Sequence, residues 1–216
     1  LMKLRKLDDA LEVSKACIEI NEKLNDKMML MWGYGLKARI QILMEDMEGA
    51  EKTLGHIQDF RPGITPPFYD NEYVLVKSLL GINQLENLEK STNQSEWNLC
   101  QKKAYKFCKE AVNCTAKTAG NRTEVIKLMG TYYWLTNNQK KALKWWRKSI
   151  TEGVKLGARP ELSRTYMEVG KRLLEKKSRY HELNSISAEE YLGKAKSLFE
   201  KMDLQWDLKE LGEIDL

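Results

Sequence analysis

Residues 126–150 read IKLMGTYYWLTNNQKKALKWWRKSI, and this stretch decides the fold. Apolar residues recur every three or four positions on both sides of Thr136-Asn137-Asn138, a run of turn-forming residues. This period is typical of amphipathic helices, and the turn-forming run ends one helix before the next begins. In the second segment Ala142, Trp146 and Ser149 stand four and seven positions apart, so they share one helical face. The stretch therefore predicts two antiparallel helices joined by a short turn.

The same face, opened by an alanine and continued four and seven residues later, recurs along the chain. The five alanines are Ala10, Ala50, Ala104, Ala142 and Ala188, at intervals of 40, 54, 38 and 46 residues. An irregular period near forty indicates stacked helix pairs with insertions in their loops. Stacking also needs a small residue wherever two helices approach closely. We therefore predict an all-α fold without a β-sheet, an α-α superhelix or solenoid of antiparallel helix pairs.

Turn and break signals divide the chain into repeats. The predicted repeats are a partial one at 1–24, then 28–60, 68–118, 122–157 and 161–202, with a closing helix at 204–212. The proline-rich stretch Phe60–Phe68 and the polar stretch Ser91–Ser95 account for the interval of 54 residues. A further insertion, Ser178–Ile186, delays the helix that begins after Ser187, for which Ser187 and Glu190 predict a capping box. Because no boundary interrupts the repeats, we predict one domain over residues 1–216.

The chain begins at Leu1 without an initiator methionine, and its first predicted helix, Leu7–Leu24, has the pattern of the second helix of a pair. We therefore expect a fragment of a longer protein. The sequence contains no signal peptide and no run of 18 apolar residues, so we expect no membrane association. The spacing of its four cysteines indicates no disulfide pairing, and Cys17 and Cys108 occupy the small-residue face. A reducing, cytoplasmic location follows as the expectation.

The sequence contains no group of residues typical of a catalytic site. Neither His56 nor His181 stands near a second ligand at metal-binding spacing, and no glycine-rich phosphate loop or nucleophile motif is present. We expect no enzyme activity, no metal, no cofactor and no small-molecule substrate. The net charge of +5 is mild and its signs are interspersed, which argues against nucleic acid. The basic run at 140–148 is more typical of a solvated helix face than of a phosphate-binding patch.

The pair at 122–157 resembles a tetratricopeptide repeat. That repeat has a large apolar residue, a Leu-Gly-like pair, an aromatic residue, and then Ala, aromatic and Ala at fixed offsets. These places are held here by Ile126, Met129-Gly130, Tyr133, Ala142, Trp146 and Ser149. The resemblance implies that Gly130 lies where the neighbouring helix leaves no room for a Cβ.

A second resemblance covers residues 130–208. This region looks like the C-terminal tail of large signalling proteins in which a class III adenylyl/guanylyl cyclase region or a kinase precedes an AAA-type ATPase module and helical repeats. Related tails occur in large transcriptional regulators with an NTPase core. The shared landmarks are Gly-x-x-Tyr-Trp-Leu at 130–135, Lys-Lys-Ala-Leu-x-Trp-Trp at 140–146, Gly-Ala-Arg-Pro-Glu-Leu-x-Arg-Thr-Tyr at 157–166 and Ala-Lys-Ser-Leu-Phe-x-Lys-Met at 195–202. The resemblance implies that ATP-using sites lie outside this chain.

In tetratricopeptide arrays the first helix of each pair lines a concave groove, which implies a set of candidate binding residues. They are Lys127, Thr131, Trp134, Arg164 and Lys171. Cations beside an exposed tryptophan suit an acidic, partly apolar segment. Two alternatives stay open: Trp134 is buried under the turn after Ser178, or other domains of the same protein fill the groove. The predicted function is a non-catalytic protein-binding and regulatory domain within a nucleotide cyclase or ATPase-type signalling protein. The alternative is a free-standing adaptor that binds a peptide or helix.

Overall fold

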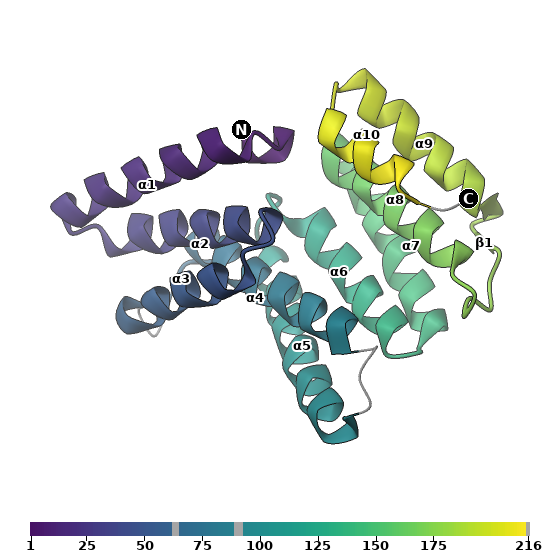
Figure 1. Cartoon of the computed structure of the whole chain (residues 1–216), viewed down its shortest axis with the longest axis horizontal. Coiled ribbons are helices and arrows are strands. Elements are labelled where there is room, and N and C mark those ends of the chain that lie inside the picture. The colour runs from purple at the N-terminus through teal and green to yellow at the C-terminus, as the bar shows by residue number, and fades with distance from the viewer. Residues whose placement is uncertain (62–64, 89–92, 215–216) are drawn as a thin grey trace. The chain divides into compact units, whose positions relative to one another are not determined.

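The structure is a computed structural model that describes residues 1–61, 65–88 and 93–214 (Figure 1). Within these residues a short 3-10 helix, Met2–Leu4, precedes ten α-helices that pack in sequential antiparallel pairs. The helices are α1 Leu7–Leu24, α2 Lys27–Leu43, α3 Met47–Phe60, α4 Pro67–Leu88, α5 Gln94–Thr115, α6 Arg122–Leu135, α7 Gln139–Lys155, α8 Arg159–Leu174, α9 Ala188–Lys201 and α10 Gln205–Gly212. The predicted fold class is confirmed.

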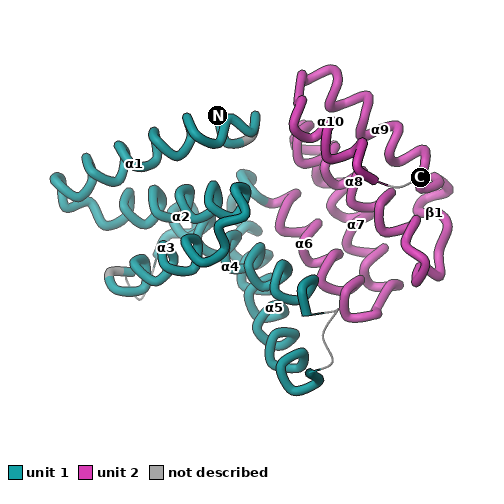
Figure 2. The backbone as a smooth tube through the Cα atoms, viewed as in Figure 1, with its two compact units in different colours: residues 1–121 teal, residues 122–216 magenta. Residues whose placement is uncertain are grey.

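The chain forms two compact units, residues 1–121 and residues 122–216 (Figure 2). In the first unit α1 packs on α2, α2 packs on both α3 and α4, and α4 packs on α5. In the second unit α6 packs on α7 and α8, α8 packs on α9, and α10 packs on α9. A single domain over residues 1–216 stays a prediction.

The predicted helix Leu7–Leu24 is observed with the same bounds, and the helix predicted after Ser187 begins at Ala188. Residues 62–64 of the predicted proline-rich break and residues 91–92 of the predicted polar loop lie outside the described residues.

Five connections between successive helices use one backbone turn. In each, a residue in the left-handed region directly precedes the residue that caps the next helix. These residues are Asn25, Glu45, Asn137, Gly157 and Asp203, with φ of 53°, 64°, 58°, 61° and 52°. After three of them, the side chains of Asp26, Asp46 and Asn138 accept hydrogen bonds from backbone N–H groups of the helix that follows. The caps satisfy donors that a helix start leaves without partners.

The insertion between α8 and α9 corrects the prediction of a fold without a sheet. It contains a two-stranded antiparallel ribbon, β1 Glu182–Leu183 and β2 Ile186–Ser187. Asn184 and Ser185 between the strands both have positive φ, which gives the tight turn that matches the twist of a hairpin. Ser187 then caps α9, and the predicted capping box with Glu190 is confirmed.

Small residues lie where paired helices cross. All five alanines of the predicted small-residue face are buried. A Cβ at Gly130 would fall on the indole ring of Trp146, and a Cβ at Gly170 would lie 2.6 Å from Cδ2 of Leu192. These glycines therefore let α7 approach α6, and α9 approach α8, more closely than any side chain would permit.

Candidate functional site

The five residues predicted to line a groove all belong to the second unit, on α6 and α8. Lys171 is exposed and Lys127 is half-buried, whereas Thr131, Trp134 and Arg164 are buried. Trp134 retains only 1% of its exposure, so the alternative in which this ring is buried holds. The expectation that Thr131, Trp134 and Arg164 face a ligand is not met, because each has a partner within the unit.

The face of α6 that carries Thr131 and Trp134 forms hydrogen bonds with α8 and its C-cap residue. The Thr131 hydroxyl donates to Glu168 at 2.8 Å, and the Trp134 indole N–H donates to Glu175 at 2.8 Å. Arg172 lies between the two carboxylates and donates to Glu168 at 2.9 Å and to Glu175 at 2.7 Å. Polar groups that sequence reasoning assigned to a ligand therefore join two helices of the unit.

Arg164 has a different role, at the closing helix. Its Nε and Nη2 donate to the two carboxylate oxygens of Asp207 at 2.7 Å and 2.8 Å, and both side chains are buried. This bidentate pair fastens α10 to α8. Lys171 lies at the edge of an open polar hollow lined also by Glu175, Glu210 and Glu213. Of the five predicted residues, Lys171 is the one that is exposed.

Glu168 is the most perturbed carboxylate of this network. Burial raises its pKa, but Arg172 and Lys127, with hydrogen bonds from Arg172 and Thr131, outweigh burial and lower the pKa to about 2. A carboxylate whose pKa is lower in the folded chain stabilises the fold above its unfolded pKa, near 4.5. That stabilisation is lost as the pH falls from 4.5 through 2.

We expect Glu168→Gln to lower the free energy of unfolding at pH 7 by about 2–3 kcal/mol, the order that the pKa shift implies. The deficit should shrink progressively between pH 4.5 and pH 2, because wild-type Glu168 becomes protonated there. Urea denaturation across this range, followed by circular dichroism, measures it. The exposed Glu200→Gln on α9 is the control and should cost much less stability at pH 7. A deficit that is independent of pH would contradict the argument.

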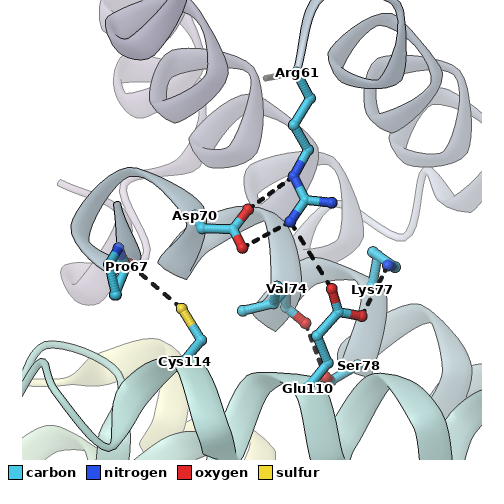
Figure 3. Close-up of polar contacts among 8 residues, drawn as sticks. All are labelled: Arg61, Pro67, Asp70, Val74, Lys77, Ser78, Glu110 and Cys114. Carbon is cyan, nitrogen blue, oxygen red and sulfur yellow. Dashed lines mark hydrogen bonds and ion pairs between the residues drawn. The ribbon is translucent and has the colours of Figure 1, made fainter. Parts of the chain in front are cut away.

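In the first unit, a charged cluster joins the C-cap of α3 to α4 and α5 (Figure 3). Arg61 donates to both carboxylate oxygens of Asp70 at 3.0 Å and 2.7 Å, and Lys77 donates to Glu110 at 3.2 Å. Beside them, burial first, and then the charges of Asp70 and Glu110, raise the pKa of the Cys114 thiol to about 11. The charges neutralise one another and the thiol stays protonated, so the cluster holds helices together and supplies no nucleophile.

An apolar groove between α1 and α2, in the first unit, was missed by sequence reasoning. It encloses about 260 Å³. Val13 and Cys17 line it from α1, and Trp32 and Leu36 line it from α2. Gly33 forms part of its floor, where a Cβ would lie 3.2 Å from Ile18.

The solvent side of α1 continues this groove with exposed apolar side chains. Val13, Ile20 and Leu24 are 59%, 56% and 70% exposed. Together with Cys17 they are spaced by four, three and four residues, so they form one stripe along the helix. The sequence carries this signal beside the small-residue face of α1, which packs on α2. We call Val13, Cys17, Ile20 and Leu24 the α1 stripe.

Within the described residues, no three or more His, Cys, Asp or Glu side chains are grouped so as to hold a metal ion. No helix among them has the length and apolar character needed to cross a membrane. In comparisons with known proteins, no family model matches the chain. No curated protein matches it either.

Proposed function

We propose that the chain is a non-catalytic protein-binding module of helical repeats, and that the groove between α1 and α2 binds an amphipathic helix of a partner. The observation that carries this proposal is the α1 stripe, which places three large apolar side chains of one helix in solvent. Contiguous exposed apolar surface beside a groove is typical of an interaction site, whereas single exposed apolar residues are ordinary.

The spacing of the α1 stripe indicates the shape of the partner. Apolar residues separated alternately by four and three positions form the seam that one helix offers to another. Trp32 and Leu36 of α2 stand on the far side of the groove and supply the second wall. A groove with two helical walls accepts a helix that presents apolar residues at i, i+3 or i+4, and i+7.

Helix packing within each unit supports this mode of binding. In the first unit α2 lies against both α3 and α4, and in the second unit α6 lies against both α7 and α8. In both trios each helix contacts the other two. A partner helix on α1 and α2 would complete a third trio of the same kind, burying apolar surface that α1 now exposes.

The resemblance of residues 130–208 to cyclase and AAA-type ATPase tails supports a setting for this module. In the C-terminal part of a larger signalling protein, the helix would come from another domain of the same protein. In a free-standing adaptor it would come from a different protein. Both settings place the helix in the same groove and share one test.

The test is a selection of phage-displayed amphipathic helical peptides on the purified chain. We expect enriched peptides to bind the double variant Val13→Glu, Ile20→Glu at least tenfold more weakly, because each glutamate puts a charge into the apolar seam. The matched control is Leu99→Glu, Val154→Glu, which changes two equally exposed apolar side chains on α5 and α7 and should leave binding unchanged.

Two outcomes would contradict the proposal. One is a selection that yields no peptide, or only peptides that bind the α1 double variant as tightly as wild type. The other is wild-type self-association, seen by sedimentation velocity, that the α1 double variant abolishes, because a second copy would then cover the stripe. Unchanged thermal melting of both double variants shows that the substitutions act on the surface.

A further inference from the structure

Helix α7 carries a row of exposed cationic side chains. The row consists of Lys140, Lys141, Lys144, Arg147, Lys148 and Lys155, and all six side chains are exposed. They lie on the side of α7 opposite to the buried Ala142, Trp146 and Ser149. At a rise of 1.5 Å per residue, this cationic row runs for about 22 Å along the helix.

No member of the cationic row forms an ion pair with any residue in the part of the chain that the structure describes. The one carboxylate on α7, Glu152, is bound to Arg122 at 3.5 Å. Helix α9 offers a contrast, because its exposed side balances three lysines with three glutamates. Like charges four residues apart, as in Lys140, Lys144 and Lys148, destabilise a helix. The row is therefore unfavourable in the free chain.

Several cations of the row are held in place by their surroundings. Lys141 lies 5.2 Å from the centre of the Tyr133 ring, and Lys148 lies 5.1 Å from that of Trp145. Arg147 donates to the side chain of Asn184, at the turn of the ribbon. Holding these side chains before binding reduces the entropy that a partner would otherwise have to remove.

We propose that the cationic row is a docking surface for an acidic helical segment of a protein. Cations separated by three or four residues match carboxylates at i, i+4 and i+7 on a helix that lies alongside. The geometry favours this partner over single-stranded nucleic acid, because Lys141 and Lys148 cover the rings on which bases would stack. The geometry also favours an acidic helical segment over a membrane. Val154 is the one large apolar side chain exposed on α7, so this helix has little apolar surface to insert into lipid.

The probe is a fluorescent 15-residue helical peptide with glutamates at spacings of three and four, measured by anisotropy with the full chain. We expect the triple variant Lys140→Gln, Lys144→Gln, Lys148→Gln to bind at least tenfold more weakly than wild type. Wild-type affinity should fall steeply between 50 and 200 mM salt, because the contacts are exposed. The matched control, Lys194→Gln, Lys196→Gln, Lys201→Gln on α9, has the same net charge and should change affinity less than twofold.

Duplex DNA of equal charge and phosphatidylserine-containing vesicles are measured in parallel. Equal weakening by the two triple variants would overturn the proposal, because only net charge would then matter. The proposal also falls if the peptide does not bind wild type, or if the duplex or the vesicles bind more tightly than the peptide through the same three lysines. The two triple variants leave α1 and α2 untouched, so this test is independent of the groove proposed above.

Discussion

Replacing Trp146 with alanine is expected to lower the free energy of unfolding by about 3–5 kcal/mol, the range for large buried aromatic side chains. The indole is fully buried, covers Gly130 of α6, and lies 5.4 Å from the ring centre of Trp134. Its N–H has no acceptor among the described residues, so the loss comes from packing and from the cavity that alanine leaves. Because the methyl group of alanine cannot refill the space against Gly130, the site should relax only in part.

Chemical denaturation followed by circular dichroism measures this loss. The neighbouring Trp145→Ala is the control, since that indole is half-buried on the same helix and its removal should cost much less. A loss below about 1 kcal/mol for Trp146→Ala would show that this ring does not hold α6 and α7 together.

The second large effect is expected at Asp207. Asp207→Ala should destabilise the second unit by about 3–5 kcal/mol, because it leaves the buried guanidinium of Arg164 without its carboxylate. It should also loosen α10, which this ion pair joins to α8 and which otherwise packs on α9. Hydrogen exchange is the sharper readout, and the amides of 205–212 should lose protection before those of α6 to α8.

A double variant separates the charge from the contact. Arg164→Met, Asp207→Leu replaces the pair by apolar side chains of similar size and should recover much of the stability, because neither charge is then buried alone. If the double variant is as unstable as Asp207→Ala, packing around α10 matters more than the lost ion pair. If the amides of α10 keep their protection from hydrogen exchange in Asp207→Ala, the ion pair does not hold α10 in place.

The positions of the helices could be predicted from the sequence because their ends are decided locally. A pair such as Asn137-Asn138 supplies a left-handed residue and a cap without reference to the rest of the chain. The ribbon was not predicted because two-residue strands carry too little alternation to register as a period.

The candidate site was harder to predict, because periodicity tells which residues share a face but not what covers that face. Trp134 was assigned to a groove, yet its acceptor Glu175 stands 41 residues away at the C-cap of α8. The α1 stripe was not predicted for the same reason. The spacing of Val13 and Ile20 shows that they share a face of the helix, but not that this face is exposed. Only the packing of neighbouring helices shows that the described residues leave it uncovered.

The shared turn between helices has a consequence for how this chain can change in evolution. Because the main chain sets the direction of each following helix, the side chains between the helices are free to differ in size. The position four residues after the alanine holds Ser14, Leu54 and Trp146 in three helices joined by this turn, and the pairing survives all three. Distant homologues should therefore keep the turn residues longer than the core residues. A profile built on Asn-Asp, Asn-Asn and Glu-Asp junctions should detect them where one built on apolar positions fails.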